Sequence, residues 1–193
     1  SASKNKLSIS PDGESFPLPE QADYAAEYGR VKALAEAARA KGQEVVVVMG
    51  VGFVGAVMAA IVADCTDRDG RPSKFVIGCQ RPSTRSFWKI PLLNRGVSPV
   101  KAEDPQVDVL IGRCVNDRKT LTATYNSQVI DLADCVVIDV QCDFLKQELG
   151  NMKSGECDMA ALEATLKTVG QHIRPECLVL IETTVAPGTT EFV

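Results

Sequence analysis

The sequence has few of the groups that several common functions require. Its 193 residues include one histidine and seven cysteines, and the cysteines form no C-x-x-C pair. Seven is an odd number and the cysteines are widely scattered, which is typical of free thiols in a reducing compartment rather than of a disulfide framework or a zinc site. We therefore expect no bound metal and a cytoplasmic location.

Two further absences narrow the choice of partner. The chain has 21 basic and 25 acidic residues, a net charge of −4, and no block of lysine or arginine. This balance gives no electrostatic support for binding nucleic acid or an anionic membrane surface. The longest apolar run is too short to cross a bilayer, and the N-terminus lacks the charged-then-apolar order of a signal peptide. We expect neither a nucleic-acid partner nor a membrane partner.

One stretch carries the main functional signal. Val45–Val48 is a run of β-branched residues without polar alternation, typical of a parallel strand covered on both faces. Gly50, Gly52 and Gly55 follow as G-x-G-x-x-G, and an Ala-rich helix is predicted from Phe53. In this pattern the first glycine permits a tight turn, the second lets the backbone approach a diphosphate, and the third lets the helix lie against the strand. The candidate dinucleotide-binding residues of the turn are Gly50, Val51, Gly52, Phe53, Val54 and Gly55. A strand–helix turn without a ligand is the alternative.

Elsewhere, hydrophobic periodicity predicts strands that alternate with helices. The further predicted strands are Lys74–Cys79, Leu121–Tyr125, Cys135–Val140 and Cys177–Glu182, and the further predicted helices are Asp23–Lys41, Ser86–Asn94, Asp104–Val115 and Asp158–Ile173. Residues 1–20 are predicted to be an extended lead-in, and residues 141–155 to be irregular.

This alternation implies right-handed crossovers between parallel strands. The predicted fold class is therefore α/β, a Rossmann-like, doubly wound and mainly parallel sheet with helices on both faces. We predict an N-terminal extension with one helix over residues 1–43 and a dinucleotide-binding Rossmann-like domain over residues 44–193.

The end of the second strand of this domain bears on the choice of coenzyme. A dinucleotide fold usually places an acidic residue there to bind the ribose of adenosine. This chain instead has Gln80 and Arg81, with Arg85 close behind. Loss of the carboxylate removes repulsion against a 2′-phosphate, and two guanidinium groups can neutralise one. Two interpretations stay open: the arginines bind the phosphate of NADP, or Gln80 bonds the ribose of NAD while the arginines contact the diphosphate or solvent.

Three separated segments resemble one family, the UDP-glucose/GDP-mannose type of nucleotide-sugar dehydrogenase. The turn GVGFVG is similar to that family's G-x-G-[YF]-V-G. The segment Leu93-Asn94-Arg95-Gly96, followed by Pro99, Val100 and Glu103, resembles L-N-x-G-x-x-P-[IV]-x-E, and residues 183–189, TTVAPGT, resemble S-T-V-x-P-G-T. The likeness covers about Glu44 to the end of the chain.

The resemblance implies NAD as coenzyme and a nucleotide sugar as substrate, oxidised by the full enzyme at the C6 alcohol to a carboxylate in two hydride transfers. In the family, a cysteine nucleophile holds the aldehyde-level intermediate. The segments with that nucleophile, and the domains through which family members form homo-oligomers, would lie beyond Val193, so we expect this fragment alone to be inactive. Thr184 matches a family threonine that helps to position the reacting water, and it is the one candidate catalytic residue.

The chain also departs from the family pattern after the fourth strand. The family's V-P-T-P is here Val140-Gln141-Cys142-Asp143, so that Cys142 replaces a threonine that would contact the coenzyme. Cys142 is either a small substitute that lines the pocket or a nucleophile beside the coenzyme. By position, the further candidate coenzyme-binding residues are Val140, Gln141, Cys142, Thr183 and Thr184. Two alternative functions stay open, a non-catalytic dinucleotide-binding module and a relative of the 6-phosphogluconate and 3-hydroxy-acid dehydrogenases.

Overall fold

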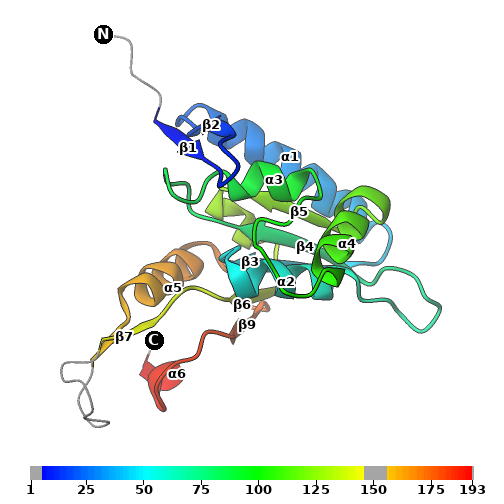
Figure 1. Cartoon of the computed structure of the whole chain (residues 1–193). Coiled ribbons are helices and arrows are strands. Elements are labelled where there is room, and N and C mark those ends of the chain that lie inside the picture. The colour runs from blue at the N-terminus through cyan, green and yellow to red at the C-terminus, as the bar shows by residue number, and fades with distance from the viewer. Residues whose placement is uncertain (1–5, 146–155, 193) are drawn as a thin grey trace.

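A computed structural model describes residues 6–145 and 156–192, and a five-stranded parallel sheet lies at the centre of the described part (Figure 1). Across the sheet the order is β5 (Leu121–Thr124), β4 (Lys74–Cys79), β3 (Glu44–Met49), β6 (Cys135–Ile138) and β9 (Leu178–Ile181). All neighbouring strands in it are parallel. The chain moves outward from β3 to β4 and β5, and then returns to the other side of β3 for β6 and β9. This order confirms the predicted doubly wound fold, with its switch point between β3 and β6.

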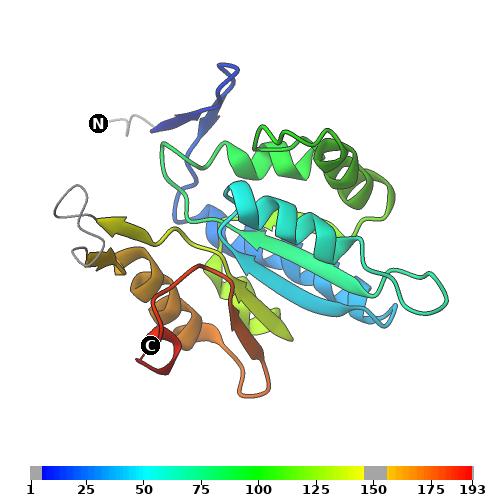
Figure 2. The same cartoon turned by 60° about the horizontal axis from the view of Figure 1, so that its bottom comes forward.

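Helices cover both faces of the sheet, which explains the continuous run of valines in β3 (Figure 2). Val45 and Val47 belong to the core on one face, and Val46 and Val48 belong to the core on the other, since successive side chains of a strand alternate. The first core also contains side chains of α1 (Asp23–Arg39), the 3-10 helix η2 (Ser127–Leu132) and α5 (Ala160–His172). The second contains side chains of α2 (Phe53–Ala63), α3 (Lys89–Asn94), α4 (Gln106–Gly112) and the π-helical turn η1 (Arg113–Asp117).

The lead-in predicted for residues 1–20 is wrong in one respect, because part of it forms a hairpin. β1 (Leu7–Ile9) pairs antiparallel with β2 (Ser15–Pro17), and Gly13, with φ 87°, lies in the connection. Three-residue strands are too short to show the alternation on which strand prediction rests. Buried Ser8 accepts a hydrogen bond from the backbone N–H of Trp88 at 3.1 Å, so the hairpin is attached just before α3.

Two other predictions need correction. The helix predicted over Asp104–Val115 changes at Arg113 from α4 into η1, although Asp104 does cap its start by accepting from the N–H of Gln106 at 2.8 Å. The stretch predicted to be irregular contains β7 (Asp143–Leu145), which pairs with β8 (Glu156–Asp158). The rest of that stretch, residues 146–155, lies outside the described residues. The chain then reaches α6 (Thr189–Phe192).

Helix α1 packs on the sheet as part of its core, although it precedes the predicted dinucleotide-binding domain. Val31, Ala35 and Ala38 are buried against the face of β3 and β4. Only residues 40–43 connect α1 to β3, so the helix runs antiparallel to β3 and its first turn lies at the carboxyl edge of the sheet. At the other end of the helix, Arg39 pairs with Asp134, just before β6, at 2.9 Å.

Asp134 ties the amino edge of the sheet together. Its carboxylate accepts from the N–H of Val45 at 2.8 Å and pairs with Arg39 and, at 3.1 Å, with Arg174. Burial alone would raise the pKa of Asp134, but these hydrogen bonds and charges outweigh it and hold the pKa below its ordinary value of 3.8.

A carboxyl whose folded-state pKa is depressed stabilises the fold above its unfolded-state pKa, and this contribution is lost as the pH falls through the folded-state pKa. We therefore expect Asp134→Asn to lower the free energy of unfolding at pH 7 by about 1–3 kcal/mol. The difference from the unaltered chain should shrink below pH 3.8. Urea unfolding across this pH range measures both effects, and a difference independent of pH would contradict the assignment.

Candidate functional site

Two glycines of the turn between β3 and α2 are required by close backbone contacts. Gly50 has φ 97°, in the region that favours glycine, and a Cβ atom there would lie 2.2 Å from the carbonyl oxygen of Asp139. A Cβ atom at Gly55 would lie 2.0 Å from the carbonyl oxygen of Gly50. These glycines let the end of β6 and the first turn of α2 lie directly against the end of β3.

Gly52 has a different environment. It precedes the first residue of α2 with φ −77°, and a Cβ atom there would meet nothing within 4 Å. Among the described residues, none accepts a hydrogen bond from the backbone N–H of Gly52, Phe53 or Val54. A helix start with unpaired N–H groups and open space in front of it attracts anions, through both hydrogen bonds and the helix dipole. The turn therefore fits a diphosphate.

A cleft of about 540 Å³ lies beside this turn, at the carboxyl edge of the sheet. The turn, the ends of β4 and β6, and residues of α1, α3 and α5 line it. Its lining residues are Tyr24, Met49, Gly50, Gly52, Cys79, Gln80, Arg81, Pro82, Lys89, Tyr125, Ser127, Asp139, Val140, Gln141, Ala161, Ala164, Thr165 and Thr168. Doubly wound proteins bind ligands in a crevice at this place, where the strand order reverses.

Several residues predicted from the sequence meet in this cleft. They are Gly50, Gly52, Gln80, Arg81, Val140 and Gln141. The side chain of Gln80 bonds back to the turn, since its Oε1 accepts from the N–H of buried Val51 at 3.1 Å. Gln80 thus links the end of β4 to the glycine turn, and its amide group remains at the cleft wall.

The other candidate coenzyme-binding residues are not part of the lining of the cleft. Phe53 and Val54 are exposed at the start of α2, and Gly55 is buried beneath Gly50. Arg85 is exposed, and Cys142 is half-buried. Their proposed contacts with a coenzyme stay predictions.

Two of the segments that suggested a family have structural roles. Asn94 Oδ1 accepts from the N–H of Ala123 at 2.7 Å, and its Nδ2 donates to the carbonyl of the same residue at 3.0 Å, so its side chain pairs with the outer edge of β5. Thr183 Oγ1 accepts from the N–H of Val140 at 3.1 Å and lies 2.8 Å from the carbonyl oxygen of Val140, which joins the segments after β6 and β9. Thr184 follows as an exposed residue, and its catalytic role stays a prediction.

Several residues that line the cleft were not predicted from the sequence. Tyr125 and Asp139 follow β5 and β6, and both are among the last two residues of the predicted strands, a position that could have indicated them. Tyr24 and Lys89 belong to helices, and no local pattern marks them as cleft residues. Desolvation lowers the pKa of Lys89 below its ordinary value. Burial, together with repulsion from Glu182, raises the pKa of Asp139 above its ordinary value, so this carboxyl beside the turn takes up a proton more readily.

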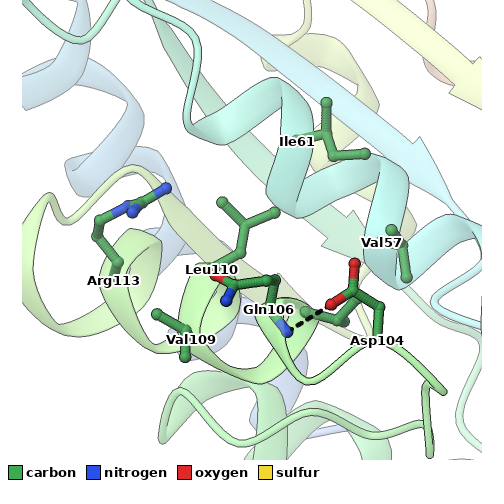
Figure 3. A pocket seen from close by; sticks show the side chains of 8 residues that line it. Val57, Ile61, Asp104, Gln106, Val109, Leu110 and Arg113 are labelled. Carbon is green, nitrogen blue, oxygen red and sulfur yellow. Dashed lines mark hydrogen bonds between the residues drawn. The ribbon is translucent and has the colours of Figure 1, made fainter.

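A smaller hollow of about 250 Å³ lies between α2 and α4 (Figure 3). Val57, Ile61 and Leu110 give it an apolar wall. Of the polar groups around it, Asp104 caps α4 and Arg113 pairs with Asp64 at 2.6 Å, so both are already engaged. The hollow lies between two helices rather than at the strand ends and is a weaker candidate for a ligand site.

No helix over residues 6–145 and 156–192 is both long and apolar enough to cross a membrane. In the same ranges, no group of three His, Cys, Asp or Glu side chains is placed to hold a metal ion.

The sheet order, the glycine turn and the cleft define a dinucleotide-binding α/β domain. The model of the UDP-glucose/GDP-mannose dehydrogenase family, NAD binding domain, matches residues 44–193. The chain belongs to this family of oxidoreductases, and the matched residues are its NAD-binding domain.

Solved structures of dehydrogenases agree with this assignment. The NDP-N-acetyl-D-galactosaminuronic acid dehydrogenase of Methanosarcina mazei Go1 is 34% identical with a TM-score of 0.67, over 82% of this chain and 31% of that one. For the GDP-mannose dehydrogenase of Pseudomonas aeruginosa, solved as a ternary complex, the identity is 27% and the TM-score 0.58, over 76% and 30% of the two chains. The UDP-D-ManNAc dehydrogenase of Pyrococcus horikoshii is 25% identical with a TM-score of 0.60, over 77% of this chain and 30% of that one. The chain thus spans about a third of the length of these relatives. A comparison of the chain with curated proteins found no match.

The contacts of the turn predict opposite results for two glycine substitutions. Gly55→Ala should lower the free energy of unfolding by about 1–3 kcal/mol, because its methyl group collides with the backbone of Gly50. Gly52→Ala should change it by less than about 0.5 kcal/mol, because its methyl group meets open space. Urea unfolding of both variants tests this, and an equal loss in the two would contradict the geometry of the turn.

Proposed function

We propose that this chain is the coenzyme-binding part of an NAD-dependent nucleotide-sugar 6-dehydrogenase, which oxidises the C6 alcohol of a UDP- or GDP-sugar to a carboxylate in two hydride transfers. The observation that carries the proposal is the open start of α2 at Gly52, beside a cleft at the switch point of the sheet. Membership of the family and the sugar-nucleotide names of the similar structures support it.

Different residues of this chain are proposed to bind different parts of the coenzyme. The N–H groups of Gly52 and Phe53 donate hydrogen bonds to the diphosphate, and the dipole of α2 adds to the attraction. Gln80 lies on the adenosine side, at the end of β4, where it can bond a ribose hydroxyl. Val140 and Gln141 lie across the turn, after β6, and form the nicotinamide side.

The bound coenzyme supplies the hydride acceptor. Thr184, after β9, is proposed to orient the reacting water with its hydroxyl group. The cysteine nucleophile, the sugar-binding groups and the contacts that form a homo-oligomer are proposed to belong to the part of the protein outside this chain. We further propose a boundary between residues 43 and 44 and a cytoplasmic location, the latter supported by the scattered cysteines.

Equilibrium binding of NADH to this chain and to Gly52→Ala tests the role of the turn. The single tryptophan, Trp88, stands next to the cleft residue Lys89 and provides a fluorescence signal that bound NADH would quench. We expect the unaltered chain to bind NADH and Gly52→Ala to bind at least about tenfold more weakly, a loss of about 1.4 kcal/mol of binding free energy. Equal affinity of the two proteins would overturn the proposal for the turn.

NADP is the second candidate coenzyme, and a specific observation favours it. Arg81 and Lys89 line the same cleft as Gln80, and neither has a carboxylate partner within 4 Å among the described residues. Gln80 also stands at the end of β4 in place of the carboxylate that would repel a 2′-phosphate on the ribose. These cations would neutralise such a phosphate in the NADP interpretation, and would border the diphosphate in the NAD interpretation.

A comparison of the two coenzymes separates the interpretations. If NAD is the coenzyme, Arg81→Ala should weaken NADH and NADPH binding by similar factors of less than about fivefold, or about 1 kcal/mol. If NADP is the coenzyme, NADPH should bind more tightly than NADH and Arg81→Ala should remove that preference. Arg68→Ala is the matched control, because Arg68 is exposed in the loop that leads into the opposite, amino edge of β4.

A non-catalytic dinucleotide-binding module is the alternative function, favoured by Gln80 and Cys142 in place of the family's usual residues. It predicts coenzyme binding without turnover. Incubation of the whole protein with NAD and UDP- or GDP-sugars distinguishes the two functions. The dehydrogenase proposal predicts two reduced coenzymes for each sugar oxidised, and binding without reduction would favour the module.

A further inference from the structure

Tyr24 brings a part of the chain outside the matched family domain into the candidate coenzyme site. The family match begins at residue 44, whereas Tyr24 lies in the first turn of α1 and lines the cleft. The direction of α1 explains this, because its last turn leads into β3 and its first turn therefore lies at the carboxyl edge. The hydrogen bond from Tyr125 Oη to the carbonyl oxygen of Asp23, at 3.4 Å, places the same turn at the end of β5.

The ring of Tyr24 is held in an aromatic cluster. Its centroid lies 5.1 Å from that of Tyr125 at an interplanar angle of 79°, an edge-to-face contact. The ring of Tyr125 in turn lies 5.8 Å from that of Phe87. The backbone of Tyr24 is also fixed, since its carbonyl accepts from Nδ2 of Asn126 at 2.8 Å. Tyr24 and Tyr125 thus form a packed aromatic wall of the cleft.

Polar contacts one turn further along α1 hold this wall against the sheet. Glu27 accepts from the hydroxyl of Thr124, the last residue of β5, at 2.6 Å. Arg30 pairs with Glu27 and donates to the carbonyl of Ala123 at 3.0 Å. A wall fixed before a ligand arrives loses little conformational entropy when the ligand binds.

The position of the wall points to the ligand group that it contacts. Tyr125 follows β5, and Gln80 and Arg81 follow the neighbouring strand β4, where the adenosine ribose of a dinucleotide lies. The nicotinamide side, after β6, lies beyond β3 in the sheet order. The planar group closest to the adenosine ribose is adenine, and aromatic side chains bind nucleobases through their ring faces and edges.

We propose that Tyr24, together with Tyr125, binds the adenine ring, so that the N-terminal extension completes the coenzyme site of the domain that follows it. This inference rests on the proposed coenzyme function. It assigns Tyr24 a role that neither the family match nor the glycine turn contains.

Calorimetric titration with NADH and with ADP tests the proposal on Tyr24→Leu and Tyr24→Phe. The leucine variant removes the aromatic ring and should bind both ligands about tenfold more weakly. The phenylalanine variant keeps the ring and should bind both within about twofold of the unaltered chain. Tyr28→Leu is the control, because Tyr28 belongs to the same helix but bonds Asp131 at 2.8 Å and does not line the cleft.

The outcomes separate this inference from the proposed function. If the unaltered chain binds neither ligand, the coenzyme function fails, and the adenine contact fails with it. If the unaltered chain and Tyr24→Leu bind both ligands equally well, only the role of Tyr24 is overturned. An equal loss in Tyr28→Leu would also overturn it, because the effect would then come from the packing of α1.

Discussion

The close approach of three backbone segments at the glycine turn is the constraint on which the rest of the structure depends. Gly50 leaves room for the carbonyl of Asp139 after β6, and Gly55 leaves room for the carbonyl of Gly50 beneath α2. Because Gly50 and Gly55 carry no side chains, α2 begins directly over the end of β3. Its first N–H groups therefore lie at the carboxyl ends of the paired strands β3 and β6, where the strand order reverses. The spacing of the glycines therefore determines where α2 begins, and with it the position of the proposed anion site beside the cleft.

The N-terminal extension and the matched domain are joined by the same core. Val31 of α1 is buried against the sheet, Arg39 pairs with Asp134 at the amino edge, and Tyr24 reaches the cleft at the carboxyl edge. The β1–β2 hairpin adds a contact through Ser8 to the residue before α3, which begins with the cleft residue Lys89. Residues before Glu44 thus support the side of the cleft next to β4 and β5 at two places, although the family match begins at residue 44.

The central part of the fold could be predicted because its signals are local. The valines of β3 and the glycines after them specify strand, turn and helix within about twenty residues, and the alternation of elements leads to a doubly wound sheet. The cleft could be predicted only from residues near the ends of strands, such as Gln80 after β4 and Val140 two residues after β6. Tyr24 and Lys89 were not predicted as cleft residues, because helix packing, rather than sequence spacing, brings them to the strand ends. The β1–β2 hairpin and η1 were not predicted, because short strands and a widened helical turn leave no periodic pattern in the sequence.

The N–H groups at the start of α2 are proposed to bind the diphosphate of a nicotinamide dinucleotide. The most direct measurement is a titration of the ¹⁵N-labelled chain with NAD, followed through the backbone amide resonances. If the diphosphate binds there, the largest shifts should occur at Gly52, Phe53 and Val54, with smaller shifts at Gln80 and Tyr125. Unchanged resonances at residues 52–54, with saturable shifts only around the hollow between α2 and α4, would contradict it.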